Sequence, residues 1–194
     1  LVHEGVKLCK AHGLGLVLAV GGGSVIDSAK AIAMGAVIDH DVWDFYMGKG
    51  APTSALPVAT ILTLPAAGSE SSTGTVITKE EGWLKRAVNS ELIYPRFSIL
   101  NPELAMTLPP FQVACGAMDI SAHLMERYFT NVKNVSFTDR LIEGTLKTIM
   151  RQAPRILANP QDYDAWSEFM WAGTIAHNNL LNTGRVGAWG SHDI

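Results

Sequence analysis

A chain of 194 residues with a formal net charge of −3 is long enough for one large domain or two small ones. Hydrophobic residues make up 47% of it and charged residues 17%, which predicts a globular protein with a sizeable core and excludes an intrinsically disordered one. The sequence has no dense run of Lys and Arg, as a nucleic-acid surface would need, and no apolar run of about 18 residues, as a membrane helix would need.

Two cysteines, Cys9 and Cys115, are too few for a disulfide framework, so we expect a reduced, cytoplasmic protein. The amino terminus has neither the charged nor the apolar region of a signal peptide. It also lacks an initiator Met, and residues 191–194 have the pattern of a first helical turn that does not continue. We therefore expect an internal fragment of a longer chain.

The first half of the chain predicts helices and strands in alternation. Residues 1–12 predict a helix that stops at Gly13, residues 15–20 predict a buried strand, and residues 24–37 predict a second helix. Residues 38–56, which include three aromatic side chains, are expected to form a compact loop. The remaining predicted elements of this half are strands or short β segments: residues 57–64, 74–78, 85–90 and 97–104. This order predicts part of an α/β layered sheet.

The second half shows only helical periodicity. Thr107 is a candidate N-cap, followed by Pro109 and Pro110 at the helix start. Pro154 is expected to kink or end the second helix of this half. The predicted helices span residues 110–129, 136–157 and 162–181. We therefore predict a partial α/β domain over residues 1–106 and a partial all-helical domain over residues 107–194.

Three glycines, Gly21, Gly22 and Gly23, join the first predicted strand to the helix that follows. Glycines let the backbone approach an anion closely, and a helix start offers unpaired N–H groups. Ser24 and Asp27, three residues apart, are expected to form a capping pair. The motif is neither G-x-G-x-x-G nor a Walker loop, so a pyrophosphate cradle and a plain tight turn are equally good interpretations.

A loop rich in small hydroxyl residues, LTLPAAGSESSTG at 62–74, follows the strand predicted over 57–64. Such residues at the carboxyl end of a buried strand suit a wall that faces a ligand. An ordinary polar loop is the simpler interpretation. Glu70, within this loop, is either catalytic or solvated.

Asp119 and His123 are four residues apart on one face of the helix predicted over 110–129. A carboxylate and an imidazole at this spacing can hold one metal ion, and a structural hydrogen-bonded pair is the alternative. His192 has no support of its own and is, taken alone, a bystander. His177 lies among helical apolar residues, where a buried histidine with satisfied hydrogen bonds is the expected state.

Five stretches, in this order, resemble the iron-containing (group III) alcohol dehydrogenases, and in particular their NAD(P)H-dependent butanol dehydrogenase branch. The resemblance implies part of a dinucleotide-binding Rossmann-like domain and part of a helical metal-binding domain, in a dehydroquinate synthase-like architecture. The stretches that carry it are GGGSVIDSAKAIA (21–33), DVWDFY (41–46), LTLPAAGSES (62–71), NPELAMTLPPFQVACGAMDISAHLMERY (101–128) and AHNNLL (176–181).

The family holds its metal with an Asp, a His four residues further on, and two later histidines. Asp119 and His123 match the first two of these positions, and His192, in WGSHDI, matches the third. The fourth position would lie beyond residue 194. The resemblance implies Fe²⁺ as the metal, and Zn²⁺ is the alternative for this donor set.

The resemblance also implies NAD or NADP as the cofactor. One residue departs from the family, because Ala67 stands where a Thr is common. The implied contacts are Gly21, Gly22, Gly23 and Ser24 at the pyrophosphate, and Thr63, Ser69 and Lys85 on the nicotinamide and ribose side.

The implied reaction interconverts primary alcohols and aldehydes by hydride transfer, with the metal polarising the substrate oxygen. No catalytic side chain beyond the metal ligands is predicted. The full-length parent is expected to be a homodimer that acts on a small molecule, and the isolated fragment is expected to be inactive. Two alternatives stay open: a glycerol dehydrogenase-like or lyase relative of the same superfamily, and a non-catalytic fragment that binds nucleotide or associates with other chains.

Overall fold

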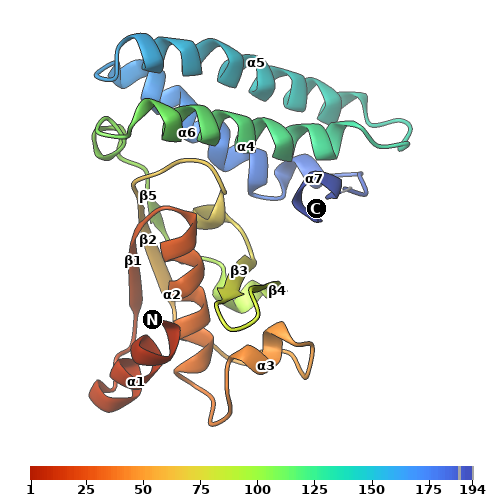
Figure 1. Ribbon diagram of the computed structural model, residues 1–194. Coiled ribbons are helices and arrows are strands. Elements are labelled where there is room, and N and C mark those ends of the chain that lie inside the picture. Colours follow the sequence, from red (N-terminus) through yellow and green to blue (C-terminus); the bar gives the residue numbers. More distant parts are fainter. Residues whose placement is uncertain (188, 194) are drawn as a thin grey trace. The chain divides into compact units, whose positions relative to one another are not determined.

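The computed structural model describes residues 1–187 and 189–193 (Figure 1). The chain divides into two compact units. The first comprises Leu1–Leu62 and Ser69–Ile99, and the second comprises Thr63–Gly68 and the segment from Leu100 onward. Among the described residues, no helix combines the length and the apolar character that crossing a membrane requires.

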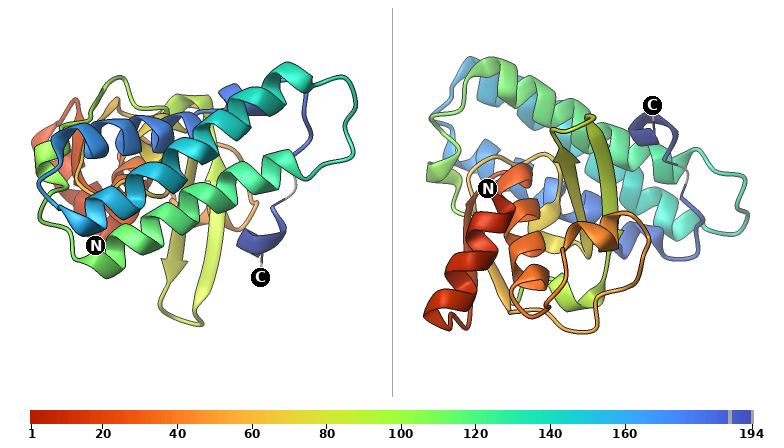
Figure 2. Two further views of the ribbon diagram at one scale, coloured as in Figure 1. Left: turned by 90° about the horizontal axis from the view of Figure 1, so that it is seen from above. Right: turned by 60° about the horizontal axis from the view of Figure 1, so that its bottom comes forward.

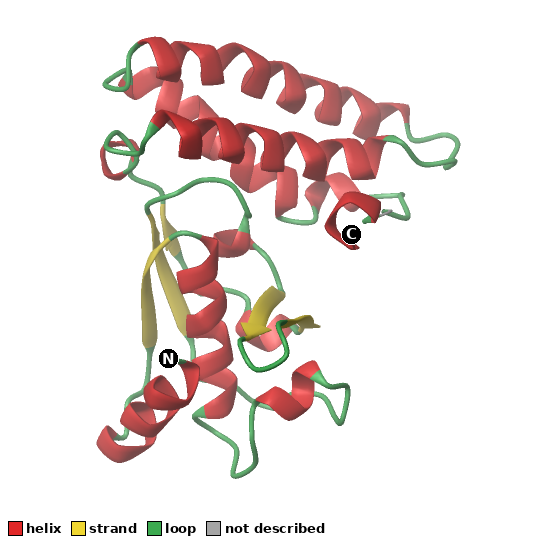
Figure 3. Cartoon of the chain, viewed as in Figure 1, coloured by secondary structure: helices red, strands yellow, loops and turns green. Residues whose placement is uncertain are grey.

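The first unit contains a parallel sheet with strand order β1-β2-β5 (Figure 3). Strand β1 spans Val17–Gly21, β2 spans Val58–Leu62 and β5 spans Ser98–Ile99. β2 lies between the other two, and four of its five residues are buried, which explains why it reads as a continuous apolar run. β1 and β2 pair in parallel along their whole length, so both end at the same edge of the sheet.

Two helices of the first unit, α1 (Val2–His12) and α2 (Gly23–Gly35), lie side by side (Figure 2). As predicted, α1 ends at Gly13, which adopts the left-handed conformation with φ of 60°. The two helices approach closely at Gly5, where a Cβ atom would lie 2.4 Å from Cδ1 of Ile32. Only glycine fits this position without displacing Ile32.

An antiparallel hairpin, β3 (Gly74–Lys79) and β4 (Leu84–Asn89), completes the first unit. It forms where the two short β segments were predicted. The aromatic segment before β2 is a correction, because residues Trp43–Tyr46 form the short helix α3 in place of a loop. The Phe45 and Tyr46 side chains are buried with Val88 of β4, so tertiary packing stabilises this single helical turn.

The strand predicted over 97–104 is much shorter in the structure, where only Ser98–Ile99 pairs with β2. The chain leaves the sheet because Pro102–Leu104 form a 3₁₀ turn. Asn101 caps this turn by accepting a hydrogen bond from the Glu103 amide, and Pro102 cannot donate to a neighbouring strand.

The second unit consists of helices joined by loops (Figure 3). The long helices are α4 (Pro110–Tyr128), α5 (Ser136–Ala158) and α6 (Tyr163–His177), which pack against one another (Figure 2). A short helix, α7 (Gly190–Asp193), contacts α4. Side chains that are fully buried between the long helices are Ile120, Leu124, Ile142, Ile149, Trp166 and Phe169.

Three details of the helical prediction are corrected. The N-cap of α4 is Pro109 and not Thr107. Of the two effects predicted for Pro154, a kink or an end of the helix, the end is not found: α5 continues to Ala158, because a proline this close to the helix end removes only one late hydrogen bond. The predicted helix 162–181 ends at His177, and the left-handed Asn179, with φ of 70°, separates it from the 3₁₀ turn that follows.

Candidate metal and nucleotide sites

The helix α4 brings Asp119 and His123 together on one face. Asp119 Oδ1 lies 3.9 Å from His123 Nε2, as the four-residue spacing predicts. The His123 side chain is buried, whereas Asp119 is 36% exposed. One acidic and one imidazole ligand are therefore fixed relative to each other by a single rigid element.

Helix α7 adds His192 to this pair. His192 Nε2 lies 3.5 Å from Asp119 Oδ1, and its ring stacks on that of His123 with centroids 4.7 Å apart and planes 11° apart. One donor atom from each of the three side chains lies within 4.8 Å of the others. Residues that are 69 positions apart in the chain thus converge on one point, and a cation is the chemical species that such a set of donors suits.

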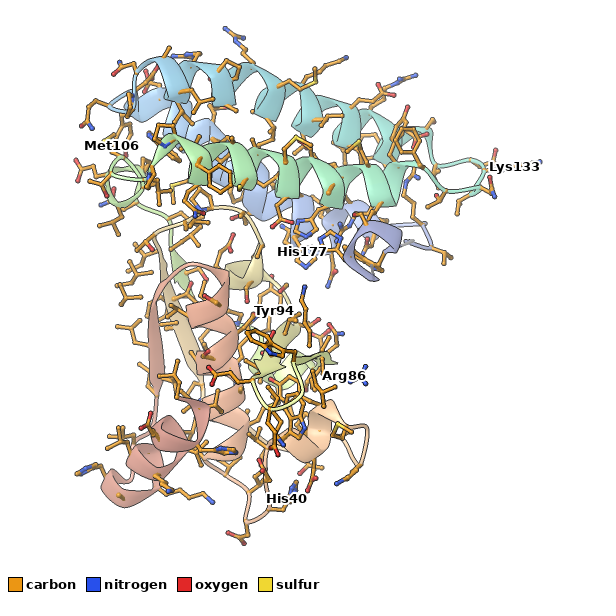
Figure 4. The ribbon with its side chains drawn as sticks, in the orientation of Figure 1. His40, Arg86, Tyr94, Met106, Lys133 and His177 are labelled. Atoms are coloured by element: carbon orange, nitrogen blue, oxygen red, sulfur yellow. The ribbon has the colours of Figure 1, made fainter. Side chains whose placement is uncertain are left out.

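The imidazole of His123 is held neutral. Burial lowers its pKa to about 2, and the nearby His177, His192 and Arg127 act in the same direction. His177, labelled in Figure 4 where α6 ends, has its ring centroid 4.3 Å from that of His123. A neutral imidazole keeps a nitrogen lone pair available for a metal ion.

A carboxylate that the sequence analysis did not single out, Glu126, holds α7 against α4. Its Oε1 accepts hydrogen bonds from the Ser191 amide at 2.7 Å and the Ser191 hydroxyl at 2.5 Å, and its Oε2 lies 2.7 Å from His192 Nδ1. Burial acts to raise the pKa of Glu126, but these hydrogen bonds together lower it below its ordinary value. The sequence does contain a pattern that places Glu126 near the other two residues, because Asp119, His123 and Glu126 follow the i, i+4, i+7 spacing of one helix face.

Arg127, also missed by the sequence analysis, lies fully buried behind His123. Its guanidinium donates to the His123 carbonyl at 2.7 Å and to Asn182 Oδ1 at 2.7 Å, and it lies 3.2 Å from His177 Nδ1. It also lies over the Trp189 ring, 4.6 Å from the centroid. Arg127 therefore ties the segment after α6 to the helix that carries Asp119 and His123. The expected satisfied histidine at 177 is found, although its side chain is only partly buried.

The segment Thr63–Gly68 packs closely on the helices of the second unit. A Cβ atom on Gly68, which has φ of 64°, would lie 2.4 Å from Cβ of His177. A Cβ atom on Gly116 of α4 would lie 2.6 Å from the Pro65 carbonyl oxygen. Glycine is required at both positions for this segment to reach α4 and α6.

The glycine turn of the first unit follows β1 directly. Gly21 ends the strand, Gly22 is the N-cap of α2 and Gly23 is its first residue. A Cβ atom on Gly21 would lie 2.6 Å from Cβ of Val25, so only glycine allows this tight return of the chain. Because Gly22 has no side chain, no N-cap side chain covers the first amides of α2. The turn therefore presents Ser24 and its neighbours as backbone donors at a positive helix end.

The expected capping pair of Ser24 and Asp27 is wrong. Helix α2 already begins at Gly23, so Ser24 lies inside the first turn. The Asp27 carboxylate instead accepts hydrogen bonds from the Ser69 hydroxyl at 2.6 Å and the Val76 amide at 3.1 Å. A tertiary contact has replaced the local one.

Lys30, one turn further along α2, is completely buried. Its ammonium group donates to the carbonyl oxygens of Ser69 at 2.7 Å, Ser72 at 2.8 Å and Gly74 at 2.8 Å. Burial lowers the pKa of Lys30 to about 8, which the neighbouring carboxylates of Asp27 and Glu70 partly oppose. Asp27 and Lys30 together fix residues 69–76, the part of the hydroxyl-rich loop that belongs to the first unit and the start of β3.

The other sequence-predicted residues are placed as follows. Ser69 is buried, and its hydroxyl is bonded to Asp27. Glu70 is also buried, so its solvated alternative is wrong. Lys85 is exposed on β4, opposite Thr78. Thr63 directly follows β2 and belongs to the second unit.

Comparison with known proteins adds family information to this geometry. Residues 1–102 match the family model described as iron-containing alcohol dehydrogenase, and residues 113–194 match the model described as the C-terminal part of the Fe-containing alcohol dehydrogenase family. These matches confirm the resemblance that the sequence motifs indicated.

Individual relatives agree with the family models. The chain is 42% identical over 193 residues to the probable NADH-dependent butanol dehydrogenase 1 of Bacillus subtilis (strain 168), covering 100% of this chain and 50% of the relative. It is 39% identical over 190 residues to the NADPH-dependent aldehyde reductase YqhD of Escherichia coli (strain K12), covering 96% of this chain and 49% of the relative. The chain thus spans about half the length of the curated relatives it matches.

A solved structure supports the fold class. The crystal structure of the NADH-dependent butanol dehydrogenase A of Thermotoga maritima superposes with a TM-score of 0.93 and 41% sequence identity. The match covers 96% of this chain and 47% of that one. The α/β arrangement followed by helices is therefore the arrangement of this family.

Proposed function

Because the chain belongs to the iron-containing alcohol dehydrogenase family, we propose that it is part of an NAD(P)-linked oxidoreductase that interconverts primary alcohols and aldehydes. The observation that carries the proposal is the convergence of Asp119, His123 and His192, whose donor atoms lie within 4.8 Å of one another. Relatives named as butanol dehydrogenases and as an aldehyde reductase support a primary alcohol or aldehyde as the small-molecule substrate.

The donor set fits a divalent transition metal. One carboxylate oxygen and two imidazole nitrogens suit Fe²⁺ or Zn²⁺, and the general affinity order favours Zn²⁺ over Fe²⁺. Asp119 would supply negative charge, and His123 would supply a nitrogen kept unprotonated by burial. His192 of α7 would supply a second imidazole nitrogen. Such an ion, when bound, supplies Lewis-acid polarisation of a substrate oxygen.

The glycine turn fits the pyrophosphate of a dinucleotide. Gly21, Gly22 and Gly23 keep side chains away from the strand-to-helix turn, and the amides around Ser24 would donate to phosphate oxygens. NAD(P), when bound, supplies the hydride acceptor or donor. Relatives named as NADH-dependent and NADPH-dependent support either cofactor.

Thr63, Ser69 and Lys85 enter the proposal as contacts on the nicotinamide and ribose side. The Ser69 hydroxyl already donates its proton to Asp27, and the Ser69 carbonyl accepts from Lys30. Ser69 would therefore contribute to cofactor binding through the fixed position of its loop and not by donating its hydroxyl proton to the cofactor. We further propose a cytoplasmic homodimer for the full-length protein. The two free cysteines support a reducing compartment.

Metal removal tests the proposal. Turnover of butanal with NADH and with NADPH is measured in the protein that carries this chain, before and after treatment with a chelator. We expect activity to disappear with the metal and to return when Fe²⁺ or Zn²⁺ is added. Undiminished turnover after complete metal removal would contradict the proposal.

A further inference from the structure

Glu126 occupies an unusual position for a charged residue. It lies on α4 three residues after His123, on the face that carries the two donor residues of that helix. Its side chain is only 9% exposed, and a carboxylate removed from water requires hydrogen-bond donors. The structure provides these donors from a single short element, α7.

Both carboxylate oxygens of Glu126 are used. Oε1 receives the amide and the hydroxyl of Ser191, and Oε2 faces His192 Nδ1 at 2.7 Å. An ionised carboxylate can only accept hydrogen bonds, so the proton of this contact resides on Nδ1. In a neutral ring the lone pair then lies on Nε2, the nitrogen that is 3.5 Å from Asp119 Oδ1.

From this geometry we propose that Glu126 is a positioning residue of the metal site, which selects the Nδ1–H tautomer of His192 and directs its Nε2 toward Asp119. The inference rests on the proposed function, because it assumes that Asp119, His123 and His192 bind a metal ion. Histidine ligands commonly donate their second ring N–H to a carboxylate, and loss of such a partner typically weakens metal binding about 10–100-fold.

The anchoring of α7 is a separable effect of the same carboxylate. Helix α7 contains four residues, too few to be stable by itself. The two hydrogen bonds that Ser191 donates to Glu126 hold α7 in place, whereas the contact between His192 Nδ1 and Glu126 orients the ring. The variant Ser191→Ala removes the hydroxyl bond to Glu126 and a 3.4 Å contact between that hydroxyl and His192 Nδ1, but it leaves the contact between Glu126 and His192 in place. It therefore weakens the anchoring and keeps the carboxylate that selects the tautomer.

The first test is Co²⁺ affinity, measured for this chain by optical titration against a competing chelator. In Glu126→Gln the amide nitrogen would donate to Nδ1, which places the ring proton on Nε2 and blocks the metal-binding lone pair. We expect about 10–100-fold weaker Co²⁺ binding for this variant and a much smaller loss for Ser191→Ala. Glu143→Gln is the matched control, because Glu143 also accepts from Tyr128 and Arg140 but belongs to another cluster.

The second test reads the tautomer directly and needs no variant. Long-range ¹H–¹⁵N spectra of the Zn²⁺-saturated wild-type chain are expected to show His192 protonated at Nδ1 and metal-bound at Nε2. Metal bound through Nδ1 would overturn the inference. Circular dichroism of Glu126→Gln establishes that any loss of Co²⁺ affinity occurs in a folded chain.

The outcomes distinguish the inference from the proposed function. Absence of Co²⁺ binding by the wild-type chain, or equal binding by Asp119→Ala, would overturn the metal site and the role of Glu126 with it. Binding that Asp119→Ala abolishes and Glu126→Gln leaves unchanged would overturn the role of Glu126 alone. Binding that both variants weaken, with the Nε2-bound tautomer in the wild type, supports the inference.

Discussion

Asp27 and Ser69, which are 42 positions apart in the chain, are joined by a hydrogen bond of 2.6 Å from the serine hydroxyl to the carboxylate. The same carboxylate receives the Val76 amide, so one side chain of α2 fixes both the loop after β2 and the start of the hairpin. This contact links the helix of the glycine turn to the hydroxyl-rich loop that the sequence analysis considered separately.

Replacement of Asp27 tests that link. Asp27→Ala leaves the Ser69 hydroxyl and the Val76 amide without their acceptor, and we expect the free energy of unfolding to fall by about 2–3 kcal/mol. Asp27→Asn retains an acceptor oxygen and is expected to cost less. Urea denaturation of both variants measures the difference. Equal stability of Asp27→Ala and wild type would mean that the loop is held by other contacts.

The buried Lys30 predicts a pH dependence of stability. Its pKa is lowered to about 8 in the folded chain from 10.5, so between these values the unfolded chain binds more protons. The free energy of unfolding should therefore rise as pH increases through this window, by up to about 1.4 kcal/mol per pH unit from this residue.

The measurement compares wild type with Lys30→Met by urea denaturation from pH 7 to pH 10. The variant is expected to be less stable, because three carbonyl oxygens lose their donor. Its free energy of unfolding should also rise less between about pH 8 and pH 10 than that of the wild type, because Lys30 no longer contributes. Lys7→Met, at an exposed position of α1, is the control and should follow the wild-type slope. Parallel slopes for wild type and Lys30→Met would contradict the lowered pKa.

Substitution of Gly68 is expected to lower the free energy of unfolding by more than backbone strain alone would. Gly68→Ala places a Cβ atom 2.4 Å from Cβ of His177 at a residue with φ of 64°. Gly13→Ala has a similar φ of 60° but open space around the added atom. We expect about 1 kcal/mol for Gly13→Ala and at least twice that for Gly68→Ala. Thermal unfolding monitored by circular dichroism ranks the two variants, and equal costs would show that the segment 63–68 can move away from α6.

Arg127 is expected to stabilise the second unit through the hydrogen bonds of its guanidinium group and not through its charge alone. Arg127→Lys keeps the charge but cannot reach the His123 carbonyl, Asn182 and His177 at the same time. We expect a loss of about 2–3 kcal/mol, measured by urea denaturation. Arg151→Lys, on the exposed side of α5, serves as the control and should be neutral. A neutral Arg127→Lys would show that the ammonium group satisfies the same pocket.

The sequence predicted the order of elements because that order depends on local patterns. Periodicity and glycines located α1, β1, α2 and the long helices, and the stop at Gly13 followed from backbone conformation alone. Local reasoning failed where a distant partner decides the role of a side chain. Asp27 was interpreted as a capping residue, whereas its acceptors are used by residues more than 40 positions away.

The candidate site shows the same limit. The spacing of Asp119 and His123 predicted their proximity, but nothing local indicated that His192 would join them. Only the order of motifs along the chain suggested it, and the structure brings its Nε2 to 3.5 Å from Asp119. Lys30 and Arg127 are fully buried, although lysine and arginine are usually exposed. The sequence does not reveal this burial, because it depends on hydrogen-bond acceptors that come from distant parts of the chain.

Metal-linked stability provides a final prediction that does not require turnover. A ligand that binds only the folded chain raises the free energy of unfolding by about 2.7 kcal/mol at 100 times its dissociation constant. At a Zn²⁺ concentration of about 100 times the wild-type dissociation constant, the free energy of unfolding of the wild-type chain should therefore rise by about 2.7 kcal/mol. At the same concentration Asp119→Ala should show only a small part of this increase, because two imidazoles alone bind the ion weakly. The metal-free stability of this variant should change by less than about 1 kcal/mol, since Asp119 is partly exposed. Asp164→Asn, at an exposed position of α6, should keep the full metal effect. Equal stabilisation of wild type and Asp119→Ala by Zn²⁺ would mean that the ion binds elsewhere and that the Asp119–His123 pair is structural.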